Sequence, residues 1–475
     1  MKDKYLIFTE YGEILDLALH LKNKGYEVYM YISDPKYRKI GDGLIDKVDN
    51  WLSEMGKGYI WVFDGCAHGS LQDKLREKGE LVFGGTEATD KLENDRQLGQ
   101  KLFKKAGFIQ PFSKNFKSID DAVKFVNDNK DKRWILKQNG NAPKHLNHMG
   151  KFDDNVDMIY HLNVLRKSWS ESEYGQVDFD LMEVVSGLEV AASAFFNGKD
   201  WLKDKQGKIV GYLNFEEKKE CDGNTGETTG EMGTLFMGVN EDNKLFKEII
   251  AKDEITKLLK ELKFKGVFDI NCIKTDKGIV ALEPTCRFGV PATSYEFIEG
   301  LNTDAGELIS AVARGESLTV DVKKGVGMVM VIAAKPYPIE TDVEALSTSI
   351  GEKLWILEEG KPIDDFSKEQ KKHIHLENFY KSEDGDYIVA TKNGYLLTVT
   401  AHGDDISKVR NELIKYIKDN IYIAGMKYRT DIGERVEKYF GIQPKSEEER
   451  IKDIKDKYDA ELKQIKDSLR KAIYE

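Results

Sequence analysis

Short apolar segments alternate with amphipathic segments through the first hundred residues, and this alternation limits the possible fold more than any other feature. The segment 12–25 carries its apolar residues at helical spacing and is a predicted helix that ends at Gly25. Strands that alternate with helices form a parallel sheet, so we predict an α/β fold that begins with a parallel-sheet domain. The predicted strands of this domain are 4–11, 26–32, 58–65 and 80–85.

The bulk composition narrows the class of protein. A chain of 475 residues corresponds to about three domains. Its net charge of −11 argues against a nucleic-acid-binding surface. None of the four cysteines forms a C-x-x-C pair, so neither a zinc site nor a disulfide framework is indicated. The first residues do not resemble a signal sequence, and no apolar run approaches roughly 18 residues, so we expect a cytoplasmic protein with no membrane partner.

A predicted hairpin at 266–283 gathers oxygen-bearing side chains. Residues two apart on a strand share a face, so Asp269 and Asn271 point the same way, and Glu283 lies at the end of the return strand. Two carboxylates with an open remainder suit Mg²⁺ bound to a nucleotide. Arg287, one turn beyond, is placed to hold a carboxylate or a transferring phosphoryl group. The alternative is an ordinary surface salt bridge at the end of a hairpin.

Other polar residues at strand ends also suit a nucleotide. Lys137 ends an apolar strand and Lys144 lies in the loop that follows, and both can hold phosphates as point charges. Glu189 is placed to accept hydrogen bonds from ribose hydroxyls, while the backbone from Glu183 to Val185 is placed to face adenine. The alternative for each lysine is a solvated surface position.

The last segment, 441–475, is a predicted amphipathic helix. Ser446 and Glu449 form a capping-box pattern, and apolar residues then recur at steps of three and four from Ile451 to Ile473. Such a stripe packs on the body of its own chain or pairs with a second copy. We therefore expect a monomer, or a homo-oligomer formed through this helix.

Five stretches of the chain resemble those of one enzyme family, in the same order. They are "FGGTEATDKLENDRQLGQKLFKKAGF" (83–108), "EEKKECDGNTGETTGEMG" (216–233), "LEPTCRFGVPAT" (282–293), "NGYLLTVTAHG" (393–403) and "YRTDIG" (428–433). The second is similar to a D-H-K-R…T-G-x-x-T-G-G-M-G loop, and the third to I-E-F-N-C-R-F-G-D-P-E-T. Together they resemble an ATP-grasp ligase and, more narrowly, the phosphoribosylamine–glycine ligase family, over about residues 1–435.

The resemblance implies ATP and Mg²⁺ as cofactors. It implies that Glu283 ligates Mg²⁺, and it places Thr285 where the family has a metal-site Asn. Asp269 and Asn271 on the facing strand complete the expected metal-binding set. Arg287 would contact the reacting carboxyl group or its acyl phosphate.

The resemblance assigns the remaining residues to ATP and the two substrates. Lys137 would contact the ATP phosphates and Glu189 the ribose. The loop 216–233, with Lys218 and Asp222 as candidate catalytic residues, would approach glycine and the amine acceptor, phosphoribosylamine in the family. The implied domains are an N-terminal domain (1–100), an ATP-grasp domain (101–320, lid about 134–200), a small C-terminal α+β domain (321–440) and the C-terminal helix (441–475).

Departures from the family concern the amine acceptor. The family opens with a glycine-rich G-N-G-G-R-E-H loop that helps to hold the phosphorylated amine, where this chain has "TEYGEILD". Glu10 and Glu13 in that segment would repel a phosphate. Val290 and Ala292 replace an Asp and a Glu of the family, and Thr285 is a poorer metal ligand than Asn. We therefore expect ATP use, with either phosphoribosylamine or, because of these losses, another amine as the acceptor.

The sequence thus predicts a ligase that activates a carboxylate such as glycine as an acyl phosphate and joins it to an amine. One alternative is a degenerate ATP-grasp protein retained as a nucleotide-binding or scaffold protein, which the altered residues favour. The other is a dinucleotide-dependent oxidoreductase, which only the N-terminal strand–helix–strand pattern suggests. The first turn lacks the G-x-G-x-x-G fingerprint, and this argues against the oxidoreductase.

Overall fold

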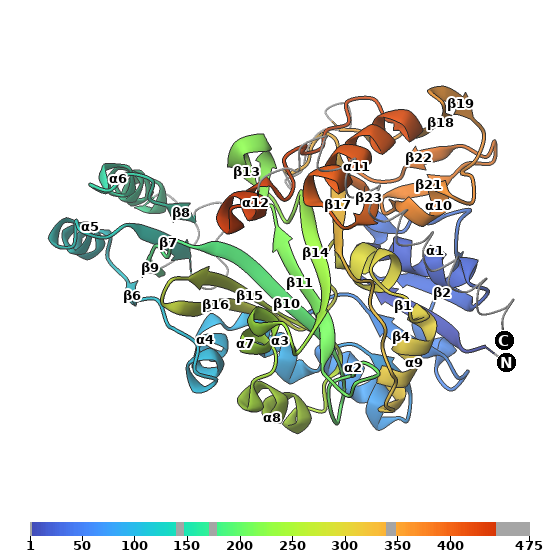
Figure 1. Ribbon diagram of the computed structural model, residues 1–475, viewed down its shortest axis with the longest axis horizontal. Helices are drawn as coiled ribbons and strands as arrows, with labels where there is room; N and C mark the ends of the chain where they lie inside the picture. The colour runs from blue at the N-terminus through green and yellow to red at the C-terminus, as the bar shows by residue number, and fades with distance from the viewer. Residues whose placement is uncertain (1, 139–146, 171–177, 339–347, 443–475) are drawn as a thin grey trace, which may run out of the picture.

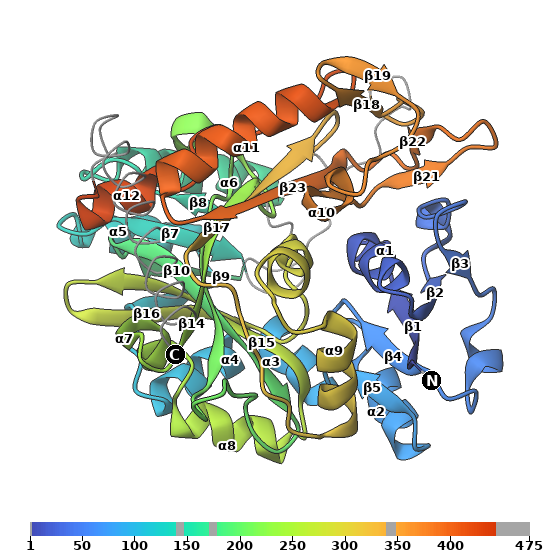
Figure 2. The same cartoon turned by 45° about the vertical axis from the view of Figure 1, so that its right-hand side comes forward.

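The N-terminal part of the chain is a parallel sheet with helices against it, as predicted. The computed structural model describes residues 2–138, 147–170, 178–338 and 348–442. The first sheet has the strand order β3-β2-β1-β4-β5, and each neighbouring pair is parallel (Figures 1 and 2). Its elements are β1 (Lys4–Thr9), α1 (Leu15–Asn23), β2 (Glu27–Ile32), β3 (Asp46–Lys47), β4 (Ile60–Phe63), α2 (Gly69–Glu77) and β5 (Leu81–Phe83).

The segment 86–108, which the sequence predicts as one helix, forms two. These are α3 (Glu87–Asn94) and α4 (Arg96–Lys105), separated by Asp95 in a non-helical conformation with φ −95° and ψ 95°. The Asp95 carboxylate accepts a hydrogen bond from the backbone N–H of Leu98 at 3.1 Å and so caps α4. A short acidic side chain that caps the next turn competes with continuation of the helix, and here the cap prevails.

A large antiparallel sheet forms the body of the molecule. Its order is β16-β15-β10-β11-β14-β17-β23-β20, so strands from beyond residue 325 continue the sheet that begins with β10. The strands are β10 (Leu188–Asn197), β11 (Val210–Glu216), β14 (Gly233–Asn240), β15 (Lys265–Thr275), β16 (Gly278–Thr285), β17 (Val326–Ala333), β20 (Ile374–Leu376) and β23 (Tyr395–Gly403). One hydrophobic core runs through this sheet and into the N-terminal domain. The helices in this part are α7 (Lys244–Ile249), α8 (Asp253–Glu261), the π-helix η5 (Thr293–Glu299) and α9 (Ala305–Arg314).

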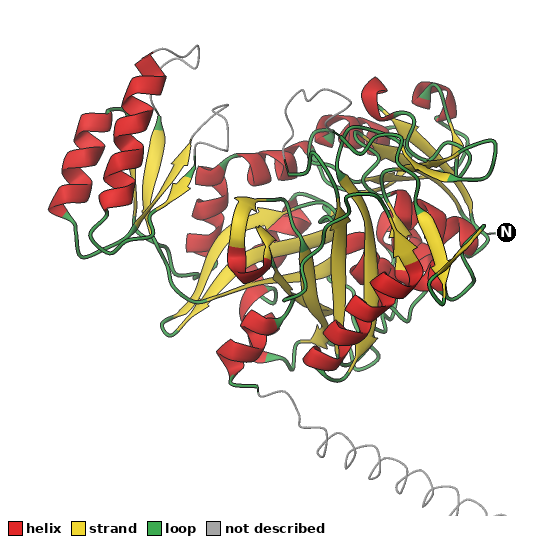
Figure 3. Cartoon of the chain, turned by 90° about the horizontal axis from the view of Figure 1, so that it is seen from above, coloured by secondary structure: helices red, strands yellow, loops and turns green. Residues whose placement is uncertain are grey.

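A smaller sheet stands out from this body as a separate arm (Figures 1 and 3). Its order is β6-β9-β7-β8, and its core is separate from the main one. The sequence of residues 179–198 predicts two strands joined by a turn at Ser186 and Gly187. This turn does not join two paired strands, because β9 belongs to the arm and β10 to the body. The arm comprises β6 (Ser113–Phe116), α5 (Ile119–Asp128), β7 (Trp134–Gln138), β8 (His148–Met149), α6 (Val156–Ser170) and β9 (Phe179–Glu183).

The last described part packs on the far end of the central sheet. Helix α11 (Ile406–Asn420) lies against β17 and β23. The other elements are α10 (Gln370–His373), α12 (Glu434–Phe440), β18 (Trp355–Glu358), β19 (Lys361–Ile363), β21 (Phe379–Lys381), β22 (Tyr387–Val389) and β24 (Ile421–Tyr422). Within the described ranges, no helix combines the length and apolarity that crossing a membrane requires. Apart from its first two residues, the predicted helix 441–475 lies outside the described residues.

Candidate functional site

The hairpin of β15 and β16 brings the four predicted metal-binding side chains together. In its register Asn271 lies opposite Glu283, and Asp269 lies opposite Thr285. A β-bulge next to Asn271 interrupts the regular pairing and marks off this end of the hairpin. The two strands therefore place these residues side by side, and their role in metal binding stays a prediction.

The carboxylate of Asp269 is enclosed and incompletely hydrogen-bonded. The side-chain amide of Asn214 donates to Oδ2 at 3.1 Å, whereas Oδ1 has no hydrogen-bond partner among the described residues. Burial, followed by the neighbouring carboxylates of Glu216 and Glu296, raises the pKa of Asp269 well above its usual range. An enclosed carboxylate oxygen beside other carboxylates is what a bound cation would compensate.

Lys218 lies at the centre of a charged cluster beside the hairpin. Its Nζ is 3.1 Å from Glu216 and 3.6 Å from Glu189. Burial alone would lower the pKa of Lys218, but Glu216, Glu189 and Glu283 outweigh that effect and raise it above the ordinary value. The ammonium group therefore stays charged and links the predicted ribose ligand Glu189 to the predicted metal ligand Glu283.

Lys137 faces the same cluster from the arm. Burial, and then the positive charge of Arg96, lowers the pKa of Lys137, while Glu283 and Glu189 oppose this shift. The positive charge of Lys218 also reaches Lys137 and lowers its pKa further. Two lysines that repel each other across a gap between carboxylates are well placed to share an anionic ligand such as a phosphate chain.

The segment between arm and body contains the predicted adenine-facing backbone. The N–H of Glu183 donates to Phe112 at 2.9 Å, and the Glu183 carboxylate pairs with Lys132 at 2.8 Å. The N–H of residue 184 is also used within the protein. The N–H groups of Glu183 and Val184 are therefore engaged within the protein and are not free to bind adenine. Lys144, the other predicted phosphate ligand, lies outside the described residues.

Arg287 is held by a partner that is far away in the sequence. Its Nε donates to Glu93 Oε1 at 3.0 Å, and the backbone N–H of Cys286 donates to Glu93 Oε2 at 2.9 Å. Its Nη1 also donates to the carbonyl of Phe288 at 2.8 Å. Burial opposes the charged form, but Glu93 outweighs it, so the pKa of Arg287 is raised. A guanidinium group has five N–H donors, so donors remain for a ligand.

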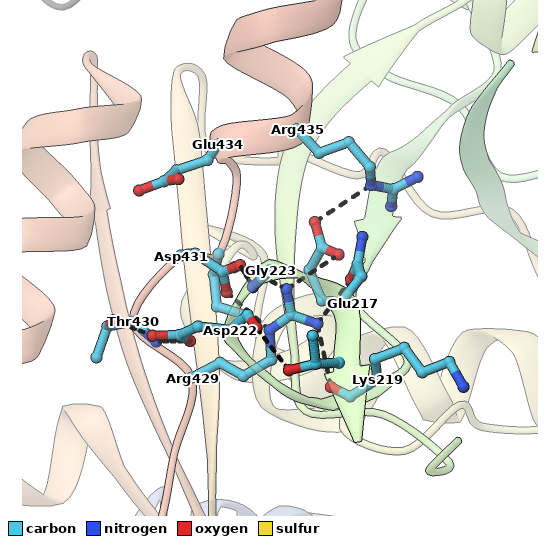
Figure 4. Close-up of polar contacts among 12 residues, drawn as sticks. Glu217, Lys219, Asp222, Gly223, Arg429, Thr430, Asp431, Glu434 and Arg435 are labelled. Atoms are coloured by element: carbon cyan, nitrogen blue, oxygen red, sulfur yellow. Dashed lines mark hydrogen bonds and ion pairs between the residues drawn. The ribbon is translucent and has the colours of Figure 1, made fainter. Parts of the chain in front are cut away.

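The predicted substrate loop is fastened to the C-terminal part of the chain (Figure 4). The loop forms the small hairpin of β12 (Lys219–Cys221) and β13 (Thr225–Thr228). Asp222 accepts hydrogen bonds from the N–H of Thr430 at 2.8 Å and from its hydroxyl at 2.6 Å. The N–H of Gly223 donates to Asp431 at 2.8 Å. The structure thus gives Asp222 an anchoring contact, while its predicted catalytic role stays a prediction.

Arg429 packs against this hairpin and holds it through hydrogen bonds. Its side chain is 1% exposed, and its Nε and Nη2 donate to Asp431 at 2.7 and 2.8 Å (Figure 4). It also donates to Asn224 at 2.9 Å and lies 3.6 Å from Glu217. We call this group of residues 217–224 and 429–431 the latch. Through the latch, the loop that carries Lys218 depends on a segment about two hundred residues later.

Three residues of the site were not predicted from the sequence. Glu216 could have been found, because it ends β11 only two residues before Lys218. Glu93 and Arg96 had no local signal, because their partners lie elsewhere in the chain and only the fold brings them together.

Known proteins are similar to this chain in sequence and in fold. The family described as "Phosphoribosylglycinamide synthetase, ATP-grasp (A) domain" matches residues 94–293. A phosphoribosylamine–glycine ligase of Lactococcus lactis is 24% identical over 366 residues, which is 75% of this chain and 79% of the relative. One of Rhodopirellula baltica is 25% identical over 387 residues, 77% of this chain and 80% of the relative. The crystal structure of phosphoribosylamine–glycine ligase from Thermotoga maritima has a TM-score of 0.62 at 18% identity, and the match covers 90% of this chain and 100% of that one.

Residues 94–293 match an ATP-grasp domain. The chain resembles the phosphoribosylamine–glycine ligases in sequence and in fold, so the predicted superfamily, fold class and ligase type are confirmed. The same fold occurs in the biotin carboxylase domain of 2-oxoglutarate carboxylase from Hydrogenobacter thermophilus, solved with MgADP (TM-score 0.58, 14% identity, covering 90% of this chain and 92% of that one).

The hairpin residues of this ATP-grasp domain fit a magnesium ion that arrives with a nucleotide. Within the described ranges, no group of three or more His, Cys, Asp or Glu could hold a metal ion. Two carboxylates, Asp269 and Glu283, with the amide of Asn271 and the hydroxyl of Thr285, would form an incomplete oxygen site. Mg²⁺ accepts such sites when phosphates and water supply the remaining ligands.

Proposed function

We propose that this chain is an ATP-dependent carboxylate–amine ligase. The observation that carries the proposal is the facing pair of Asn271 and Glu283, with Lys218 linked to Glu283 and Glu189, inside an ATP-grasp domain. Glycine is the default carboxylate, because the similar proteins are phosphoribosylamine–glycine ligases. We place the reaction in the cytoplasm, where ATP and such substrates occur.

Each charged group has a role in this proposal. Lys137 and Lys218 hold the ATP phosphates, Glu189 the ribose, and Arg287 the carboxyl group that is to react. Asp269 and Glu283, with Asn271 and Thr285, would hold Mg²⁺, which when bound neutralises part of the phosphate charge. The site acts chiefly by positioning its reactants and by stabilising negative charge.

The proposed reaction has two bond exchanges. A carboxylate oxygen attacks the γ-phosphorus of ATP, the bond to the bridging oxygen breaks, and ADP leaves. The nitrogen of a neutral amine then attacks the carbonyl carbon of the acyl phosphate, and inorganic phosphate leaves with the electrons of the broken C–O bond. The nitrogen loses one proton, so the products are an amide, ADP, phosphate and a proton.

The acceptor is expected to differ from phosphoribosylamine. Glu10 and Glu13 stand where the family has glycines and an arginine. Two like charges about 4 Å apart cost on the order of 4 kcal/mol at an effective dielectric constant near 20. Such a cost corresponds to roughly a thousandfold loss of affinity for a phosphate group.

ADP release measured across a matrix of carboxylates and amines tests the proposal. The matrix includes glycine with phosphoribosylamine generated in the assay. We expect ADP release that requires both substrates, that is weak with phosphoribosylamine, and that exceeds hydrolysis of ATP alone. ATP binding without ADP release for any pair would instead support a nucleotide-binding scaffold protein. Turnover with glycine and phosphoribosylamine at about 1–10³ s⁻¹ would establish the ordinary family reaction.

A further inference from the structure

A second charged site lies at the carboxyl ends of the strands of the N-terminal sheet. In the order β3-β2-β1-β4-β5, the connections from β1 and from β4 run to opposite sides, so the order reverses between these two neighbours (Figure 2). Ligands of open α/β sheets bind outside the carboxyl ends of the strands at such a reversal. Glu10 and Glu13 follow β1 at this edge, and Asp64 follows β4.

Carboxylates from three parts of the chain meet at this edge. Asp64 and Glu377 are 6% and 3% exposed, whereas Glu13 is exposed. The charge of Glu13 acts on Asp64, and the charges of Asp16, Glu13 and Asp64 act on Glu377. Oδ2 of Asp64 and both carboxylate oxygens of Glu377 are buried without a hydrogen-bond partner among the described residues. Buried carboxylates in native proteins are normally paired, so these three oxygens are candidate acceptors for a ligand.

Glu377 occupies a position that suits an anion. The backbone N–H of Leu15, the first residue of α1, lies near enough to lower the pKa of Glu377, although burial and the neighbouring carboxylates prevail. Helix N-termini are common phosphate sites. Here the protein places its own carboxylate there, and a phosphate group would meet Glu377, Glu13 and Asp64 instead of free N–H groups.

Arg287, a cation that acts on the cluster, is already engaged. Arg287 is close enough to lower the pKa of Asp64, but it is the last of the influences on that carboxyl. Its own strongest partner is Glu93, at 3.0 Å. The cluster therefore adjoins the guanidinium that would hold the reacting carboxyl group, and its carboxyl groups are not neutralised by that guanidinium.

We propose that this site binds the amine acceptor as a diamine without a phosphate group, whose second, protonated nitrogen is held by Asp64 and Glu377. The first nitrogen, in its neutral form, then lies on the Arg287 side and attacks the activated carboxyl group. This assignment rests on the proposed ligase function for the fate of the acceptor, but the binding of the diamine can be measured without ATP.

Calorimetric titration of the full-length protein at physiological salt tests the assignment. The probes are putrescine, a four-carbon diamine; butylamine, which lacks the second nitrogen; and ribose 5-phosphate, which supplies the phosphate. We expect putrescine to bind at least roughly tenfold more tightly than butylamine, because only the diamine can leave one nitrogen in the acidic cluster. Ribose 5-phosphate binding at this site, shown by competition, or equal binding of the two amines, would overturn the proposal.

Two nearly isosteric variants locate the binding. Asp64→Asn and Glu377→Gln should each weaken putrescine binding roughly tenfold or more while leaving ATP binding unchanged. Glu412→Gln, which removes an exposed carboxylate of α11, is the matched control and should bind putrescine as the wild type does. Folding is checked by thermal unfolding; Glu377→Gln should not lower the melting temperature, because it removes a buried carboxylate that has no hydrogen-bond partner. Unchanged putrescine binding in both folded variants would contradict the assignment.

The pH dependence provides an independent measurement on the wild type. Burial, and then Glu13, raises the pKa of Asp64 to about 7, against the lowering effects of Thr9 and Arg287. A protonated carboxyl group cannot pair with an ammonium ion, so putrescine affinity should fall as the pH drops through about 7. Burial, followed by Asp16, Glu13 and Asp64, also raises the pKa of Glu377 well above its usual range, so the affinity should continue to rise above pH 7. An affinity that does not change through this range would count against Asp64 as a ligand.

The two proposals fail in different ways. Putrescine binding without ADP release for any carboxylate would remove the ligase and leave the diamine site. ADP release with other amines, but no putrescine binding, would remove the diamine site and leave the ligase.

Discussion

At the scale of single residues, the pKa of a buried carboxyl group depends on whether a cation lies beside it. Glu299 and Glu377 are 4% and 3% exposed. Glu299 has Lys323 at 3.0 Å and His373 at 3.2 Å, whereas Glu377 faces other carboxylates. Burial by itself acts to raise the pKa of both groups. Only in Glu299 do the two cationic partners outweigh burial, and they lower its pKa to about 2.

Replacing Glu299 with Gln should therefore cost stability in a pH-dependent way. The folded-state pKa is about 2, below the ordinary value of 4.5, so the contribution is present above pH 4.5 and is lost as the pH falls through the folded value. A shift of this size corresponds to about 3 kcal/mol at neutral pH. Urea unfolding of the wild type and Glu299→Gln at several pH values measures it. A difference between the two proteins that stays constant from neutral pH into this acid range would show that the ion pair contributes nothing.

Glu283→Gln should abolish Mg²⁺-dependent ATP turnover with little effect on stability. Glu283 is exposed at the end of the hairpin, so its replacement removes little packing. Loss of one carboxylate leaves Asp269 as the single charged ligand of the proposed metal site. The readouts are ADP release as a function of Mg²⁺ concentration and thermal unfolding. Asp276→Asn, in the turn of the same hairpin, is the control and should be fully active. Normal turnover by Glu283→Gln would end this assignment.

The sequence could predict contacts between residues that belong to one hairpin. Asp269, Asn271 and Glu283 were expected to meet because strand periodicity and a short turn fix their positions. It could not predict that Glu93 holds Arg287, or that Glu377 joins Asp64. Those pairs form only because separate elements pack against each other, and strand or helix periodicity contains no information about such contacts.

At the scale of elements, the latch transmits the position of the C-terminal part to the substrate loop. The Asp222–Thr430 contact adds two hydrogen bonds to the buried Arg429–Asp431 pair. We expect Asp222→Ala and Thr430→Ala to lower the rate of amide formation more than they weaken ATP binding. A loop that is held loosely still admits ATP but positions the acceptor poorly.

A double-mutant cycle checks this interpretation of the latch. If Asp222 acts through Thr430, the double variant should be no slower than the worse single variant, with a coupling of at least about 0.5 kcal/mol. If Asp222 instead touches the substrate, the two losses should add, and its predicted catalytic role would stand. Lys408→Ala, at an exposed position of α11, is the control for general effects on the C-terminal part.

Elements are predictable when their own residues determine them. The first parallel sheet follows from alternating patterns that lie within its own hundred residues. The break at Asp95 was missed because periodicity continues across it, and only the cap on Leu98 separates α3 from α4. The pairing of β14 with β17 was also beyond reach, since it joins strands almost one hundred residues apart.

At the scale of the whole molecule, the described chain ends beside an apolar hollow. The hollow has a volume of about 560 Å³, and Phe215 and Met237 of the central sheet line it together with Tyr439 and Phe440. Phe440 is 53% exposed, and the neighbouring Ile442 is 45% exposed. Large exposed apolar groups at one place are typical of a surface that another segment covers. The apolar stripe predicted from Ile451 to Ile473 begins only nine residues further on.

Deleting residues 446–475 tests whether that stripe belongs to the fold. If the predicted helix covers the hollow, its removal exposes apolar surface at about 25 cal/mol per Å², so the melting temperature and the solubility should fall. If the helix instead joins two copies, the deleted protein should have half the mass of the full chain in light scattering, at concentrations where the full chain is a dimer. A variant with Leu462 and Ile465 both changed to Ser is the control, because it keeps the chain length and interrupts the stripe alone. It should reproduce the effect of the deletion in either case. Unchanged melting temperature and unchanged mass in both variants would show that the predicted helix is dispensable.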